Sequence, residues 1–149
     1  QDFGPSFQVP VGGATTRTLS NEGILTFNGD GTGTFAGKSL SINHNLTGGG
    51  AFPVGEADFT CPLTYTVNPD GSFTTQVECS GTVLSGGGAG SRYTVSGIEL
   101  TGQLGRGGQI FIANDTNQNV ETFTFTPPGG TTLFFKRICG RSQTAIRMR

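Results

Sequence analysis

The feature of this sequence that most limits its fold is a β-hairpin in the middle of the chain, between Phe59 and Cys79. Its turn reads Asn68-Pro69-Asp70-Gly71, and Pro at the second position with Gly at the fourth is typical of a type I turn closed by a bulge. Pairing Asn68 with Ser72 then sets the partner of every other residue, because strand register follows from the turn. The sequence therefore predicts two antiparallel strands in one register.

This register separates the hairpin into an apolar and a polar face, as expected of a sheet with one side packed on a core. The apolar face carries Phe59, Leu63, Tyr65, Val67, Phe73 and Val77, and the polar face carries Thr60, Thr64, Thr66, Thr74, Gln76 and Glu78. The same register places Cys61 opposite Cys79, at a Cα separation that a disulfide permits. We therefore predict a Cys61–Cys79 disulfide, which leaves Cys139 as a free thiol.

The rest of the chain follows the same all-β pattern. Of 149 residues, 26 are Gly and only 13% are charged, and short segments rich in Thr and Phe alternate with Gly-rich turns. No apolar stripe of helical period persists for three turns, so we expect no helix. Outside the hairpin, the expected strands are residues 24–27, 32–37, 40–46, 92–104, 109–113, 120–126, 132–139 and 144–148. Residues 40–46 are either a separate strand or a continuation of the preceding one past a bulge at Gly37.

A meander of eight to ten short strands leaves two exposed edges unless its sheet closes on itself. We therefore expect an antiparallel meander closed into a small barrel of about eight strands, with a β-sandwich as the alternative. The barrel is expected to occupy residues 23–149 as one domain. Residues 1–22 contain Pro5 and Pro10 and little alternation, which favours an extended N-terminal arm that packs over the barrel or adds an edge strand.

Several features favour a secreted or periplasmic protein without a transmembrane segment. No apolar run reaches the 18 or so residues of a membrane span. The chain opens on Gln1 instead of Met, which suggests a cleaved signal peptide, and a disulfide indicates an oxidising compartment. Two tripeptides, Asn45-Leu46-Thr47 and Asn114-Asp115-Thr116, match the glycosylation pattern and matter only in a eukaryotic source.

The candidate ligand-binding residues are His44, Tyr65, Lys136 and Arg137. His44 is the only histidine and shares its strand face with apolar residues, where a packed or rim position is more common than an acid–base role. Lys136 and Arg137 follow three apolar residues, so alternation directs one of them into the barrel. An inward cation could anchor a carboxylate or phosphate, although a cation at the rim that extends to water is the more ordinary outcome. Tyr65 belongs to the apolar face of the hairpin.

The sequence predicts no cofactor, no metal site and no nucleic-acid partner. The segment from Asn28 to Ser39 begins like a calcium loop but lacks the acidic twelfth residue, so we expect a hairpin turn there. The oxygen-bearing residues between Asp115 and Glu121 read as a polar loop, and the cysteines lack zinc-ligand spacing. Five of the nine basic residues lie in the last 14, and we expect them to pair with acidic neighbours in the fold.

Three stretches carry a resemblance to a known group of proteins: residues 23–35, residues 65–71 leading to Glu78-Cys79-Ser80-Gly81-Thr82, and Ile138-Cys139-Gly140-Arg141. They resemble small exported bacterial proteins of uncharacterised function with a calycin-like or allene-oxide-cyclase-like barrel. The resemblance implies a barrel and export. It carries over no catalytic residue, because none of the cyclase's active-site positions can be matched here.

Our leading hypothesis is an exported, non-enzymatic β-barrel that binds a small apolar or amphiphilic ligand in its interior. One alternative is a structural subunit of an extracellular assembly, in which residues 1–22 add a strand to a neighbour and Cys139 crosslinks subunits. A further alternative is a cyclase- or isomerase-like enzyme with an apolar cavity and His44.

Overall fold

The computed structural model describes residues 2–8, 15–45, 54–105, 107–115 and 119–148. These residues form ten strands and no helix. The strands are β1 (Asp2–Gln8), β2 (Thr15–Phe27), β3 (Thr32–Asn45), β4 (Val54–Val67), β5 (Ser72–Thr82), β6 (Arg92–Gly105), β7 (Ile110–Asn114), β8 (Asn119–Thr126), β9 (Leu133–Cys139) and β10 (Ser142–Ile146). The all-β prediction is confirmed.

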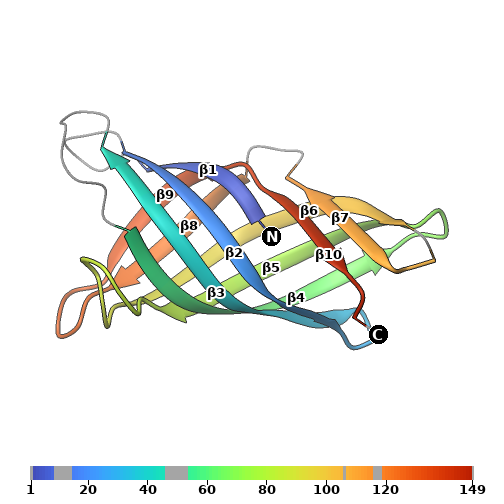
Figure 1. The fold of residues 1–149 in the computed structure, drawn as a ribbon, viewed down its shortest axis with the longest axis horizontal. Coiled ribbons are helices and arrows are strands. Elements are labelled where there is room, and N and C mark those ends of the chain that lie inside the picture. The colour runs from blue at the N-terminus through green and yellow to red at the C-terminus, as the bar shows by residue number, and fades with distance from the viewer. Residues whose placement is uncertain (1, 9–14, 46–53, 106, 116–118, 149) are drawn as a thin grey trace.

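The antiparallel sheet is nearly closed into a barrel (Figure 1). Consecutive strands pair from β1 to β6, β6 pairs with β8, β8 with β9, and β9 returns to β1. This ring of eight strands confirms the barrel. Of the segment expected as an arm, residues 2–8 form β1 and residues 15–22 begin β2, and β1 lies between β2 and β9 instead of at an edge.

The sheet departs from a simple meander at β6, where it forks. The first part of β6, Arg92 to Ser96, pairs with β8, whereas Thr101 to Gly105 pair with β7, which in turn pairs with β10. Between these parts Gly97 has a φ of 83°, and the register with β5 shifts at this point. Such a bulge needs a residue that tolerates positive φ, and it lets Val95 and Ile98, three positions apart, both face the interior.

The central hairpin has the predicted register. Val67 lies opposite Phe73 and Leu63 opposite Val77, and the Cys61–Cys79 disulfide is present with a Cα–Cα distance of 4.0 Å. Cys61 is 2% exposed, so the disulfide lies inside the barrel. The disulfide prediction is therefore confirmed, and Cys139 is the free cysteine of the described residues.

Two hairpin turns, at residues 28–32 and 68–72, share one hydrogen-bond arrangement. In the first, the Oδ1 atom of Asp30 accepts from the backbone N (2.9 Å) and Oγ1 (2.6 Å) of Thr32, and in the second Asp70 accepts from Ser72 in the same way (2.9 and 2.7 Å). The side-chain hydrogen bonds lower the pKa of both carboxyl groups. The segment that begins like a calcium loop is thus a hairpin turn, as expected.

The barrel interior is apolar around β4, β5 and β6, and the outer face of these strands is rich in Thr. The core residues are Phe59, Cys61, Leu63, Phe73, Val77, Val95, Ile98, Leu100, Phe111, Ala113 and Phe123. Strand β3 runs unbroken past Gly37, which pairs with Gly23 of β2. A Cβ atom on Gly37 would overlap the carbonyl oxygen of Glu22, so only glycine permits this close strand contact.

Candidate functional site: a cavity with a cationic side

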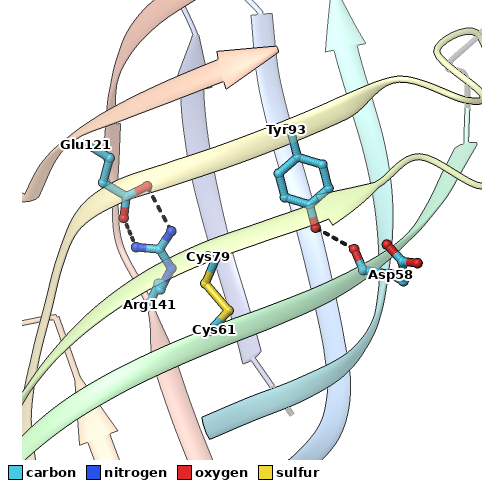
Figure 2. Close-up of a disulfide and its surroundings, with 6 residues drawn as sticks. All are labelled: Asp58, Cys61, Cys79, Tyr93, Glu121 and Arg141. Atoms are coloured by element: carbon cyan, nitrogen blue, oxygen red, sulfur yellow. Dashed lines mark hydrogen bonds and ion pairs between the residues drawn. A yellow bond between two sulfur atoms is a disulfide. The ribbon is translucent and has the colours of Figure 1, made fainter. Parts of the chain in front are cut away.

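The barrel encloses a cavity of about 490 Å³ next to the apolar core. Its apolar lining comes from side chains of β2, β3, β4, β5, β6, β8 and β9, and it includes the disulfide that Figure 2 shows. The apolar lining residues include Phe59, Cys61, Leu63, Val77, Val95, Ile98, Phe123, Phe125, Leu133 and Phe135. Ser85 and Gly87 of the loop after β5 and the partly exposed Leu133 also line it, so the cavity reaches the surface at this end.

The same lining contains a polar set of side chains as well. Its residues come from β2, β3, β6 and β9 and from the chain that enters and begins β10: Arg17, Asn21, Ser39, Ser41, Tyr93, Arg137, Arg141 and Gln143. Strand alternation brings them inward, since Arg17 and Asn21 are four residues apart on β2 and Ser39 and Ser41 are two apart on β3. One cavity is thus lined by both apolar and hydrogen-bonding side chains.

Glu121 on β8 holds two of the arginines in place and is itself fully buried. Its Oε2 atom accepts from Nε of Arg137 at 2.8 Å. Arg141 donates to both oxygens, from Nη2 to Oε2 at 2.9 Å and from Nη1 to Oε1 (Figure 2). The Arg137 guanidinium also lies 4.9 Å from the centre of the Phe123 ring. These contacts fix the orientation of Arg137 at the cavity wall.

The polar side of the cavity carries positive charge. Among the described lining residues there are three arginines and no carboxylate, because Glu121 lies behind the lining. Burial, and then the positive charge of Arg137, lower the pKa of Arg17 to about 10. Burial also lowers the pKa of Arg137. An anion placed beside Arg17 and Arg137 would offset both effects.

The structure places the ligand-binding residues that were predicted from the sequence in different positions. Arg137 is the inward cation and is 5% exposed, whereas Lys136 faces outward and donates to Oγ1 of Thr122 at 2.6 Å. Tyr65 is half-buried and lines a second groove, not this cavity. His44 lies in β3 opposite Thr16, and its side chain is outside the described part of the structure.

Sequence reasoning missed most of the polar lining, including Arg17, Tyr93 and Arg141, and it also missed Glu121 behind the lining. Arg17 lies in the segment read as an arm. Tyr93 lies on the part of β6 that pairs with β8, and Glu121 of β8 lies directly opposite Arg137 of β9. The Tyr93 hydroxyl donates to the carbonyl oxygen of Asp58 at 2.8 Å (Figure 2). A usable signal existed for Glu121, since the C-terminal basic residues were expected to pair with acidic neighbours.

Cys139 is buried beside this polar side, at the end of β9. Burial raises the pKa of its thiol, although the positive charge of Arg137 acts in the opposite direction. A thiol with a raised pKa is a poor nucleophile at neutral pH.

A second groove, of about 930 Å³, lies between the end of β2 and β10. Aromatic side chains form its floor, with the rings of Phe27 and Tyr65 4.8 Å apart and those of Phe73 and Phe111 stacked at 4.3 Å. Phe35 and Gln143 line both the groove and the cavity, so the two spaces are neighbours inside the barrel.

The fold and site define an antiparallel β-barrel with an interior cavity that is lined by apolar side chains and by three arginines. Comparison with known proteins adds nothing to this class: no family model, curated protein or solved structure matches the chain. The resemblance to calycin-like and cyclase-like barrels therefore stays a prediction. Within the described residues there is no group of side chains suited to a metal ion, and no helix is long and apolar enough to cross a membrane.

Proposed function

We propose that this chain is an exported, non-enzymatic barrel protein that binds a small amphiphilic molecule in its interior. The observation that carries the proposal is one cavity lined both by apolar side chains and by Arg17 and Arg137. An amphiphile with an anionic head group matches both kinds of side chain at once. Export is supported by the intramolecular disulfide, which persists in oxidising compartments.

The size and chemistry of the cavity favour binding of a small molecule. Ligand cavities typically measure roughly 300 to 1,000 Å³ and combine an apolar lining with a few placed polar groups, and the cavity of about 490 Å³ lies in this range. An anionic head group would form charge-assisted hydrogen bonds with guanidinium groups, which are among the strongest polar contacts in a low-dielectric site. The apolar part would pack against the Phe-rich wall.

Displacement of a fluorescent fatty-acid probe by decanoate and by decanol tests this proposal, because the two share one chain and differ in head-group charge. We expect both to displace the probe and decanoate to bind roughly 10-fold more tightly, since a hydrogen bond to a charged group contributes about 1.5 kcal/mol or more. Arg17→Met should remove the preference, whereas Lys136→Met, which changes an outward cation, should not. Failure of both compounds to displace the probe, or to bind in native mass spectrometry, would overturn the proposal.

The alternative of an assembly built through residues 1–22 has less support, because β1 lies between two strands of its own barrel. The alternative of an enzyme that uses His44 stays a prediction.

A further inference from the structure

The cavity and the second groove follow one another along the strands of the barrel. On β2 the lining of the cavity ends at Asn21, and that of the groove begins at Gly23. On β4 the lining of the cavity ends at Leu63, and that of the groove begins at Tyr65. Strands β2 and β4 are both antiparallel neighbours of β3, so they run in the same direction. The groove therefore extends the cavity in one direction along the barrel.

Gln143 of β10 lines both spaces, and it is buried, with only 8% of the residue exposed. Strand alternation directs it inward, since the residues on either side of it are exposed. Its side-chain amide forms no hydrogen bond with any residue that the structure describes. Buried polar side chains nearly always have a hydrogen-bond partner, because an unsatisfied amide loses its hydration without compensation. A polar atom of a molecule bound in these two spaces would supply that partner.

The strand positions set the length of a ligand that occupies both spaces. Arg17 and Gly23 are six residues apart on β2, which is about 20 Å in an extended strand. An extended chain of single bonds advances roughly 1.2 Å per bond, because three backbone bonds span about 3.6 Å. A chain of eighteen carbons therefore spans about 20 Å, from Arg17 to the start of the groove, whereas a chain of ten carbons spans about 11 Å and stays in the cavity.

We propose that the ligand is a long-chain amphiphile with an oxygen atom in the middle of its chain, and that this oxygen hydrogen-bonds to the amide of Gln143. The inference rests on the proposed function and narrows its ligand to one chemical class, the hydroxy and oxo fatty acids. An amide both donates and accepts, so Gln143 accepts from a hydroxyl group or donates to a carbonyl group. Gln143 follows Arg137 by six positions, so their Cα atoms lie within about 22 Å of one another. An oxygen between carbons 6 and 14, about 6 to 16 Å from a head group at Arg137, falls within this limit.

A series of octadecanoic acids with the hydroxyl group on carbon 6, 8, 10, 12 or 14 tests the proposal on the unaltered protein. Displacement of a fluorescent fatty-acid probe measures the affinity of each acid below its micelle concentration, with octadecanoate and decanoate as references. We expect one position in the series to bind about 5-fold more tightly than the other isomers, since a hydrogen bond contributes about this factor. The other isomers bury the same hydroxyl group without a partner, which lowers their affinity.

The variant Gln143→Met keeps the length of the side chain and removes its amide, so the preferred position should disappear from the series. Gln143→Leu repeats this test with a second apolar side chain, and Gln76→Met, at an exposed residue of β5, should keep the preference of the parent protein. Equal binding of all five isomers to the parent protein, or a preference that survives in Gln143→Met, would overturn this inference. Binding of decanoate and octadecanoate would in that case still support the proposed function, whereas failure of every acid to bind would overturn both.

Discussion

Replacement of Glu121 by Gln should destabilise the barrel strongly, because it removes the carboxylate that neutralises two arginines. Glu121 is fully buried, Arg137 is 5% exposed and the side chain of Arg141 is 16% exposed. The variant keeps the shape of the side chain and leaves both guanidinium groups without this counter-charge. Breaking a buried ion pair from one side costs about 3 to 5 kcal/mol.

For a chain of this length each kcal/mol lowers the melting temperature by about 2 to 4 °C, so the midpoint of E121Q should fall by roughly 6 to 20 °C. Urea unfolding measures the free energy directly, provided that the slope of the unfolding free energy with urea is unchanged. The matched control is Lys38→Met, which breaks the exposed Lys38–Glu56 pair at 3.1 Å and should cost less than about 1 kcal/mol.

The double variant E121Q/R137M separates the loss of charge balance from the loss of packing. Because it removes a charge of each sign, we expect its cost to be smaller than the sum of the two single costs, with a coupling of about 0.5 to 3 kcal/mol. If E121Q costs no more than Lys38→Met, or if the two single costs simply add, Glu121 does not hold Arg137 and Arg141 in place.

Three further perturbations test the fold around the site. Burial raises the pKa of the Cys139 thiol from 9.0, so above this pH the folded state keeps a proton that the unfolded chain releases. The free energy of unfolding should therefore fall more steeply above pH 9.0 in the parent protein than in Cys139→Ala. Gly37→Ala should lower the free energy of unfolding in urea by about 3 kcal/mol or more, because its Cβ atom would overlap a neighbouring carbonyl oxygen. Gly29→Ala, at a residue with a φ of 85° and open space around it, should lower it by about 1 kcal/mol. Replacement of Cys61 and Cys79 together by Ala should cost about 3 kcal/mol, given a sequence separation of 18.

Each of these expectations has a result that contradicts it. Parallel pH profiles for the parent and Cys139→Ala would mean that the thiol titrates alike in the folded and unfolded states. Similar costs for the two glycine variants would remove the close contact between β2 and β3 as an explanation of Gly37. For the disulfide, titration of the unfolded, unreduced chain should find one thiol, and three would show that the bond does not form.

The hairpin and its disulfide were determined by the sequence, because the information that specifies them is local. The turn from Asn68 to Gly71 sets the register of its two strands, and that register alone brings Cys61 opposite Cys79. The same reasoning located most of the other strands and the closure of the barrel, since alternation and the cost of open edges act within and between adjacent segments, but it did not locate β1 or the first part of β2. It also required that Lys136 and Arg137 point to opposite faces, but not which of them points inward.

Tertiary structure alone decided the cavity and the groove. Arg17 and Arg137 stand 120 positions apart in the sequence and meet only because β1 joins β2 to β9. Arg141 reaches Glu121 from just past the end of β9, and the fork at β6 sends β10 to β7 and leaves the second groove between β10 and β2. Contacts of this kind depend on how the barrel closes, and a pattern read along one strand carries no information about which distant strand completes the ring.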